Sequence, residues 1–271
     1  MAWSVRSTGL IAAAFSLAVS MSPAIAADQL QTLIAGPQRT EPNRVRDPYR
    51  HPLETLKFFH LRDNMKVVEI WPGGSGWWTE ILAPYLSKHG KLYEALPNPA
   101  SSNEAKRGNE IFAAKMAAAP DLYGKVIATT LDGDHNKIAP DNSVDLVLIF
   151  RNLHDWVPQG TADGALKAVY RALKPGGVLG IEDHRAANNQ PQDPTVKSGY
   201  LREDYTIALM KRAGFKFAGK SEVNANPKDT KDYPSGVWTL PPTLRLKDQD
   251  RDKYVAIGES DRYTMKFVKP R

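Results

Sequence analysis

The chain contains no cysteine among its 271 residues. This absence excludes disulfide bonds, thiolate nucleophiles and zinc or iron–sulfur sites with cysteine ligands. A strong charge bias is also missing, because 36 basic and 30 acidic side chains give a formal net charge of +6 that is spread along the chain. Since no block of Lys and Arg stands out, the sequence does not indicate a nucleic-acid partner.

Long hydrophobic runs are scarce as well. The exception is an apolar segment at residues 10–19, which follows the single charge of Arg6 and precedes an Ala-Ile-Ala motif that ends at Ala26. This order is typical of a cleavable signal peptide. The alternative, a membrane anchor, needs about 20 continuous apolar residues, and serines and a proline interrupt this segment. We therefore predict a signal peptide over residues 1–26, a periplasmic or secreted protein, and no membrane span in the mature chain.

Apolar runs and helical patterns alternate along the rest of the chain. Strand patterns occur at residues 65–70, 90–96, 126–129, 144–150, 178–181, 215–223 and 263–268. Helical patterns occur at residues 28–35, 52–59, 77–87, 103–118, 164–173 and 201–213. Strands separated by helices at this spacing indicate βαβ units. The sequence therefore predicts an α/β protein with a Rossmann-like, doubly wound sheet and helices on both faces.

Two segments fall outside this alternation. A polar, proline-containing arm at residues 36–50 precedes the first strand, and residues 224–260 contain four prolines and little periodicity. Insertions of this length in compact domains are usually lids or binding loops. We predict an N-terminal arm and helix over residues 27–52, followed by one domain over residues 53–271 that carries an insertion at about 224–260.

The first strand runs directly into a glycine-rich loop. Glu69 lies near the end of the strand, and Gly73, Gly74 and Gly76 follow it. Parallel sheets bind ligands beyond the carboxyl ends of their strands, and glycines allow a ligand to approach the backbone. A dinucleotide fingerprint needs one more glycine where Thr79 stands, and the Lys-Ser/Thr pair of a P-loop is absent. A nicotinamide-dependent oxidoreductase is therefore a weak alternative.

This loop and three later segments together resemble the class I S-adenosylmethionine-dependent methyltransferases. The first motif reads VVEIWPGGSGWWT at residues 67–79, and LDGD at residues 131–134 looks like the acidic turn after the third strand of that family. NSVDLVL at residues 142–148 is similar to its fourth strand, and LKPGGVL at residues 173–179 to the start of its fifth. The resemblance implies seven strands, mostly parallel with an antiparallel last strand. It also implies S-adenosylmethionine as the methyl donor.

The resemblance narrows further through the motif FRNLHDW at residues 150–156. Together with EIWPGG in the glycine-rich loop, this motif is similar to a group of exported predicted methyltransferases. The chain departs from the family at Trp71, which stands where a glycine is usual.

The resemblance also implies which residues bind the donor. Glu69 organises the loop, and Gly73, Gly74 and Gly76 line the methionine part of the donor. Asp134 lies near the adenine amino group. The family's acid for the ribose falls on Leu96 here, and Glu94 is the expected substitute because it shares the strand face. Arg151 completes the predicted donor set.

Catalytic candidates follow the fourth and fifth strands, where acceptors dock in this fold. They are His154 and Asp155 after the fourth strand, and Asp183 and His184 after the fifth. A histidine near its ordinary pKa of about 6.5 suits general-base catalysis. We predict His154, His184 and Asp155 as catalytic and expect no metal. The alternatives are structural hydrogen bonds for each residue, or an oxygen–nitrogen metal site as in catechol-type methyltransferases.

Basic residues near these positions suggest further contacts. Arg50 and His51 could fold over the donor site, or Arg50 and Asp47 could form no more than a surface ion pair. Arg151 and Arg185 are the candidates to bind an acidic substrate. The sequence thus predicts a methyltransferase that acts on a small molecule. The alternative is a non-catalytic protein that binds a small ligand on the same fold.

Overall fold

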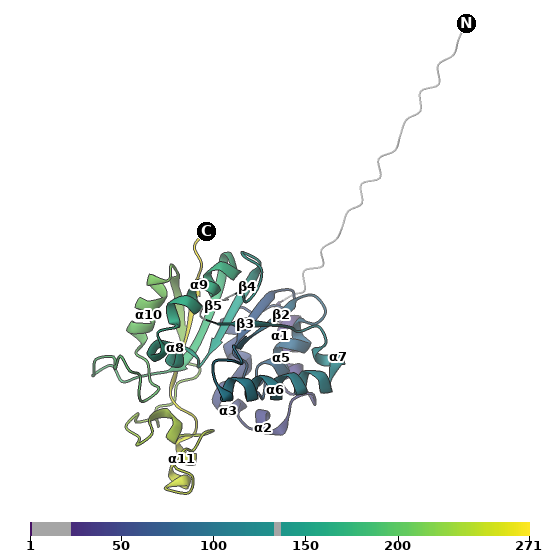
Figure 1. The fold of residues 1–271 in the computed structure, drawn as a ribbon. Helices are drawn as coiled ribbons and strands as arrows, with labels where there is room; N and C mark the ends of the chain where they lie inside the picture. The colour runs from purple at the N-terminus through teal and green to yellow at the C-terminus, as the bar shows by residue number, and fades with distance from the viewer. Residues whose placement is uncertain (2–22, 133–136) are drawn as a thin grey trace.

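A seven-stranded sheet forms the centre of the molecule (Figure 1). The computed structural model describes Met1 and residues 23–132 and 137–271. The strands are β1 (Lys66–Ile70), β2 (Lys91–Pro97), β3 (Ile127–Leu131), β4 (Val144–Phe150), β5 (Leu173–His184), β6 (Lys216–Ser221) and β7 (Arg262–Val268). Their order is β3-β2-β1-β4-β5-β7-β6, with β7 antiparallel to both neighbours and the other pairs parallel. The predicted sheet with an antiparallel last strand is confirmed.

Helices cover both faces of the sheet. They are α1 (Pro23–Ile34), α2 (Glu41–Arg44), α3 (Asp47–Arg50), α4 (Pro52–Phe58), α5 (Thr79–Leu86), α6 (Asn103–Ala118), α7 (Pro120–Tyr123), α8 (Leu153–Gln159), α9 (Ala162–Ala172), α10 (Glu203–Arg212) and α11 (Arg251–Ile257), with a 3₁₀ turn η1 (Gly236–Thr239). Figure 1 shows α8, α9 and α10 on one side and α1, α5, α6 and α7 on the other. Within the described residues, no helix combines the length and the apolar character that a membrane span requires.

Two apolar cores result from the alternation of side chains along the central strands. Val67 and Leu148 pack with α1, α4 and α5, whereas their chain neighbours Val68 and Val147 pack with α8, α9 and α10. Successive side chains of a strand point to opposite faces, so a strand covered by helices on both sides is mostly apolar. This requirement explains why β1 and β4 read as nearly continuous apolar runs.

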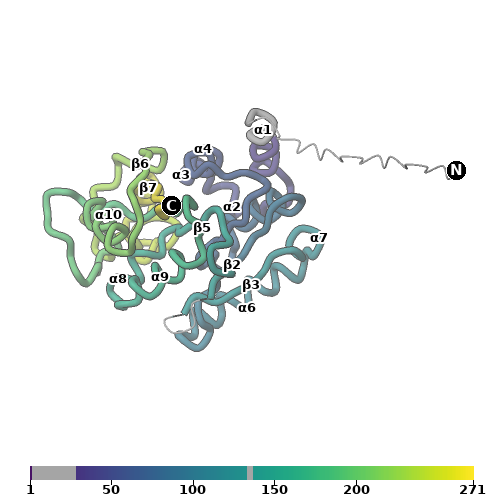
Figure 2. Tube along the Cα trace, turned by 90° about the horizontal axis from the view of Figure 1, so that it is seen from above, coloured from purple at the N-terminus to yellow at the C-terminus, as the bar shows by residue number. Residues whose placement is uncertain are grey.

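The arm and the proline-rich segment both lie against the sheet. β7 begins at Arg262, which pairs with His184 at the carboxyl end of β5, so residues 222–261 return to that edge. Figure 2 shows α3 and α4 beside β7, and the side chains of Arg262 and Lys266 contact the backbone carbonyls of Tyr49 and Phe58. Both segments therefore reach the edge where a parallel sheet binds its ligands.

Several elements differ from the sequence prediction. The arm contains α2 and α3, each with a proline in its first turn, where the ring fits the helix. The helix α8 was missed because seven residues show too little periodicity. β5 begins at Leu173, earlier than predicted, because this residue pairs with Val144 before an irregularity in the register. The predicted signal peptide lies mostly outside the described residues, which resume at Pro23 in α1, so it stays a prediction.

Candidate functional site

Two adjoining cavities open at the carboxyl ends of the parallel strands. The first, here called the histidine cavity, has a volume of about 330 Å³ and lies among His154, His184, the arm and residues 237–260. The second, here called the glycine-loop cavity, has about 630 Å³ and lies between the glycine-rich loop, the end of β2 and α6. Residues that line both are Trp71, Gly73, Asn152, Asp155 and Trp238. The two cavities therefore meet above the ends of β1 and β4.

The glycine-rich loop packs closely on α6. A Cβ at Gly74 would lie 3.2 Å from the side chain of Ile111, and one at Gly76 would lie 3.2 Å from Phe112. Gly73 and Gly76 both have a φ in the left-handed region, at +69° and +55°, but a Cβ at Gly73 would meet no atom within 4 Å. Gly73 thus leaves open space at the junction of the two cavities, whereas Gly74 and Gly76 allow the close packing.

Glu69 and Glu94 form a buried carboxyl pair on adjacent strands. They are partners in the β1–β2 register and are 2% and 0% exposed. The hydroxyl of Thr79 donates to Glu69 Oε2 at 3.0 Å. Burial raises the pKa of Glu69 to about 7. Burial also raises the pKa of Glu94 well above its usual value, and the charge of Glu69 adds to this shift.

The structure places Glu94 away from both cavities. Glu69 lines the histidine cavity, while the β2 residues at the glycine-loop cavity are Leu96 and Pro97. Glu94 lies behind Glu69, so it does not reach the position expected for a ribose-binding acid. The shared strand face was correct, but that face leads into the core under α5.

Replacing Glu94 with glutamine is expected to stabilise the protein at alkaline pH. The raised pKa means that the folded chain keeps this proton at pH values where the unfolded chain has lost it, so stability falls as pH rises above about 4.5. The glutamine amide stays neutral and can donate to Glu69. We expect the free energy of unfolding at pH 8 to increase by about 1–3 kcal/mol. Urea unfolding at pH 5 and pH 8 measures this difference.

The matched control for this prediction is Glu54→Gln on the exposed surface of α4. It should leave the pH dependence of unfolding unchanged. An equal decline of stability with pH in wild type and Glu94→Gln would contradict the assignment of a strained buried carboxyl pair.

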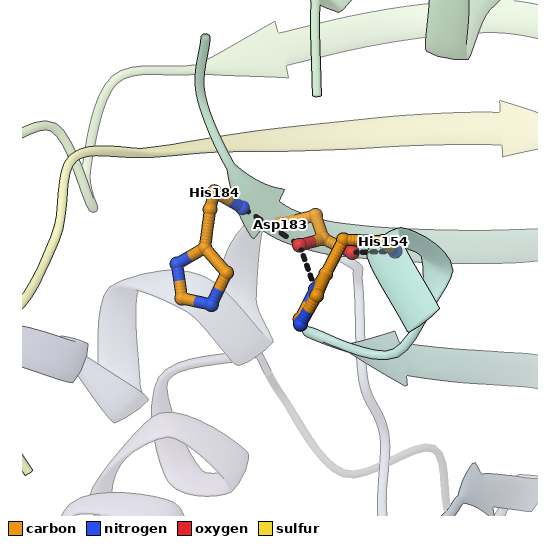
Figure 3. Close-up of side chains that lie close together, drawn as sticks. All are labelled: His154, Asp183 and His184. Atoms are coloured by element: carbon orange, nitrogen blue, oxygen red, sulfur yellow. Dashed lines mark hydrogen bonds and ion pairs between the residues drawn. The ribbon is translucent and has the colours of Figure 1, made fainter. Parts of the chain in front are cut away.

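Asp183 holds His154 in place at the end of β5 (Figure 3). The aspartate is fully buried, and its Oδ1 lies 2.7 Å from Nδ1 of His154. Its oxygens also accept the backbone N–H groups of Leu153, His154 and His184 at 2.8–3.2 Å. These bonds fix the start of α8 and place the proton of the His154 ring on Nδ1, so Nε2 is the basic nitrogen.

The pKa values of the two histidines are shifted in opposite directions. Burial lowers the pKa of His154, but the charge and hydrogen bond of Asp183 outweigh burial and raise it above 6.5. The pKa of His184 is lowered well below 6.5 by burial, and His154 lowers it further. The His184 ring lies 4.8 Å from that of His154 and its Nδ1 is 2.5 Å from Ser260 Oγ. Pairs of groups with pKa values pushed apart are typical of acid–base sites.

The same residues bear on the metal alternative. His154, Asp183 and His184 offer ligand atoms that lie within 4.8 Å of one another. Both oxygens of Asp183 already accept hydrogen bonds from N–H groups, which favours a role in orienting His154 over direct coordination of an ion. The expectation that the site needs no metal stays a prediction.

Arg50 is buried at the histidine cavity. It is 2% exposed, its Nε lies 3.3 Å from Glu259, and its guanidinium lies 4.7 Å above the ring of Trp77. Asp47 pairs instead with Arg39 at 2.5 Å. The prediction of a surface ion pair between Asp47 and Arg50 is therefore wrong, because the arm folds inward and buries Arg50.

The structure places the other two basic candidates, Arg151 and Arg185, in different surroundings. Arg151 lines the histidine cavity, next to the catalytic candidates. Arg185 forms ion pairs with Glu203, Glu222 and Asp261 at 2.5–2.9 Å. The prediction that Arg185 binds an acidic substrate is therefore wrong, because three carboxylates from distant segments already neutralise its charge.

Two further predicted site residues are His51 and Asp134. The Nδ1 of His51 lies 3.2 Å from Asn224 Oδ1, and His51 is not among the residues that line either cavity. Asp134 lies outside the described residues.

Several residues of the site were not predicted. Asn152 donates from Nδ2 to the carbonyl of Ile70 at 2.8 Å and so links β4 to β1 below the cavities. Trp238, Glu259 and Ser260 come from the segment before β7. The sequence indicated that this segment covers the site, but no local pattern marked which of its side chains face inward.

Comparisons with known proteins agree with this geometry. No curated protein matches the sequence. Residues 74–181 match a family model described as a methyltransferase domain. A S-adenosylmethionine-dependent methyltransferase from Aquifex aeolicus is similar in fold, with a TM-score of 0.53, 18% identity, and coverage of 89% of this chain and 97% of that chain.

Two further structures share the fold. The [4+2]-cyclase SpnF has a TM-score of 0.55 and 15% identity over 90% of this chain and 93% of that chain. Phosphoethanolamine N-methyltransferase 2 from Haemonchus contortus, solved with S-adenosyl-L-methionine, has a TM-score of 0.53 and 14% identity over 82% of this chain and 53% of that chain. Residues 74–181 thus match a methyltransferase domain, and the strand order and these structures show that the chain shares the fold of S-adenosylmethionine-dependent methyltransferases.

Proposed function

We propose that the protein transfers a methyl group from S-adenosylmethionine to a small-molecule acceptor, with His154 as general base. The observation that carries this proposal is the junction of two cavities beside the Asp183–His154 pair. The larger cavity has the volume for a nucleoside-sized donor, and the smaller one for a compact acceptor. Trp71, Gly73 and Asp155 line both, which is where the reacting atoms would meet.

The described residues fit the donor. A Cβ added at Gly73 or at Gly108 of α6 would meet no atom within 4 Å, and both glycines line the glycine-loop cavity. A smaller cavity of about 90 Å³ continues from Trp71 to Leu131 and Asp132. We propose that the adenine binds there, and that the amino-acid end lies beside Glu69, Gly73, Gly74 and Gly76.

Bound S-adenosylmethionine supplies an electrophilic methyl group on a sulfonium. The cavity walls hold the acceptor nucleophile in line with that methyl, and such positioning contributes about 7–11 kcal/mol in comparable reactions. Nε2 of His154 accepts the proton that the acceptor loses as the new bond to carbon forms. Asp183 and Asp155, whose Oδ1 lies 3.6 Å from Nε2, both stabilise the resulting imidazolium. His184 stays neutral and orients the acceptor by hydrogen bonding.

The proposal includes export to the periplasm or medium. It is supported by the apolar segment and the Ala-Ile-Ala motif before Asp28, and by the absence of cysteine. N-terminal sequencing of the protein from a cell envelope fraction tests it, with Ala27 expected as the first residue.

Calorimetric titration with S-adenosylhomocysteine tests donor binding. We expect micromolar affinity for the purified protein, and a loss of at least about tenfold in Glu69→Gln, because the loop loses the carboxylate that holds Thr79. Melting temperatures establish that the variant is folded. Folded protein that releases no heat would contradict the enzyme and favour a non-catalytic ligand-binding protein, to which the neutral Leu96 at the ribose position already points.

A further inference from the structure

Three arginines and three acids line the histidine cavity, but the arginines share one of these acids. Arg46, Arg50 and Arg151 line it, and Glu259 is the carboxylate they share, at 2.6, 3.3 and 4.0 Å. The buried Arg262 also forms an ion pair with Glu259, at 2.9 Å. One carboxylate therefore faces four guanidinium groups.

The other nearby acids have partners of their own. Glu182 pairs with Arg262 at 3.2 Å. Glu69 accepts the hydroxyl of Thr79, and Asp155 lies beside His154. Burial lowers the pKa of Arg151, whereas the charges of Glu259 and Glu182 raise it and those of Arg262 and Arg46 lower it.

Two guanidinium donors at this cavity are unsatisfied. Nη2 of Arg46 and Nε of Arg151 are buried and find no hydrogen-bond partner in the part of the chain that the structure describes. Unsatisfied buried donors are costly, and guanidinium groups bind carboxylates and phosphates with two parallel hydrogen bonds. A carboxylate or phosphate is a ligand of the kind that these free donors bind well.

Arg151 has the best position to bind this anion next to the reacting atoms. It follows β4 directly, and its backbone N–H donates to the carbonyl of Glu182 at 2.7 Å, which ties it to β5. Its φ of +60° lies in the left-handed region, which a non-glycine residue adopts at a cost. Such conformations are concentrated at functional sites. This backbone places the guanidinium in the cavity together with His154 and His184.

We infer that the acceptor carries a carboxylate or phosphate group, which Arg151 binds so that the nucleophile of the acceptor faces His154. This inference rests on the proposed methyl transfer. The donor also has a carboxylate, and the arm supplies Arg46 and Arg50 for it. Arg151, which follows β4 and lies next to His154 and His184, then serves the acceptor.

Titration of simple probes into the complex with S-adenosylhomocysteine tests the inference. The probes are benzoate, phenyl phosphate and the neutral benzyl alcohol. We expect one of the two anions to bind at least tenfold more tightly than the alcohol, and the stronger one identifies the oxyanion. Arg151→Gln should reduce that affinity about tenfold or more and leave the affinity for S-adenosylhomocysteine within about twofold. Arg151→Lys should restore part of it, and Arg212→Gln, on the exposed end of α10, should change neither.

Three results would overturn the inference. They are equal binding of the anions and the alcohol, anion binding that Arg151→Gln leaves intact, and a parallel loss of S-adenosylhomocysteine affinity, which would assign Arg151 to the donor. The same probes are also titrated into the ligand-free protein. Anion binding there without any binding of S-adenosylhomocysteine would contradict the proposed function and still locate an oxyanion site.

Discussion

Replacing Gly108 with leucine is expected to weaken the binding of S-adenosylhomocysteine by about 100-fold or more, equivalent to about 2.7 kcal/mol. Gly108 lies inside α6 and lines the glycine-loop cavity, and a Cβ there would meet no atom within 4 Å. The leucine side chain would therefore enter the cavity without displacing protein atoms. Because the position is helical, the new residue also fits the backbone better than glycine does.

Gly108→Ala is the matched control. Its single methyl group should raise the free energy of unfolding by about 0.5–1 kcal/mol, as for other glycines inside helices, and should disturb binding far less than leucine. Calorimetry gives the affinities and urea unfolding gives the stabilities. If Gly108→Leu were folded and bound S-adenosylhomocysteine as tightly as wild type, the donor would not occupy this cavity.

His154→Ala is expected to reduce kcat by about 10²–10⁴-fold, the usual contribution of a general base. The base acts when Nε2 is unprotonated, so the rate should rise with pH, with a midpoint above 6.5, because Asp183 and Asp155 raise the pKa of His154. Asp183→Asn removes the main charge responsible and should move that midpoint to lower pH. Rates of methyl transfer from labelled donor to an acceptor that carries an oxyanion measure both effects.

Direct titration of the His154 ring by NMR separates catalysis from structure. A midpoint above 6.5 in wild type and a lower one in Asp183→Asn are expected. The raised pKa also predicts that His154 contributes stability that is fully present below pH 6.5 and is lost as pH rises through its folded value. If the pH–rate profile of folded Asp183→Asn were the same as that of wild type, His154 would not be the base.

The sequence alone determined the sheet and the place of the site. Buried strands are mostly apolar on both faces, so β1 and β4 could be predicted from their apolar runs. The glycines before α5 indicated where a ligand approaches the backbone. Local patterns also located His154 and His184 correctly at neighbouring strand ends. These features depend on residues close in the chain, so periodicity and spacing record them.

Tertiary structure alone decided which charged groups are available. Arg185 and Arg50 looked alike in sequence, yet one is neutralised by three carboxylates and the other is buried at the cavity beside Glu259. Glu94 is on the predicted strand face but points into the core. The pairing of a charge depends on segments up to about two hundred residues away, and its energy depends on burial, which no local pattern records.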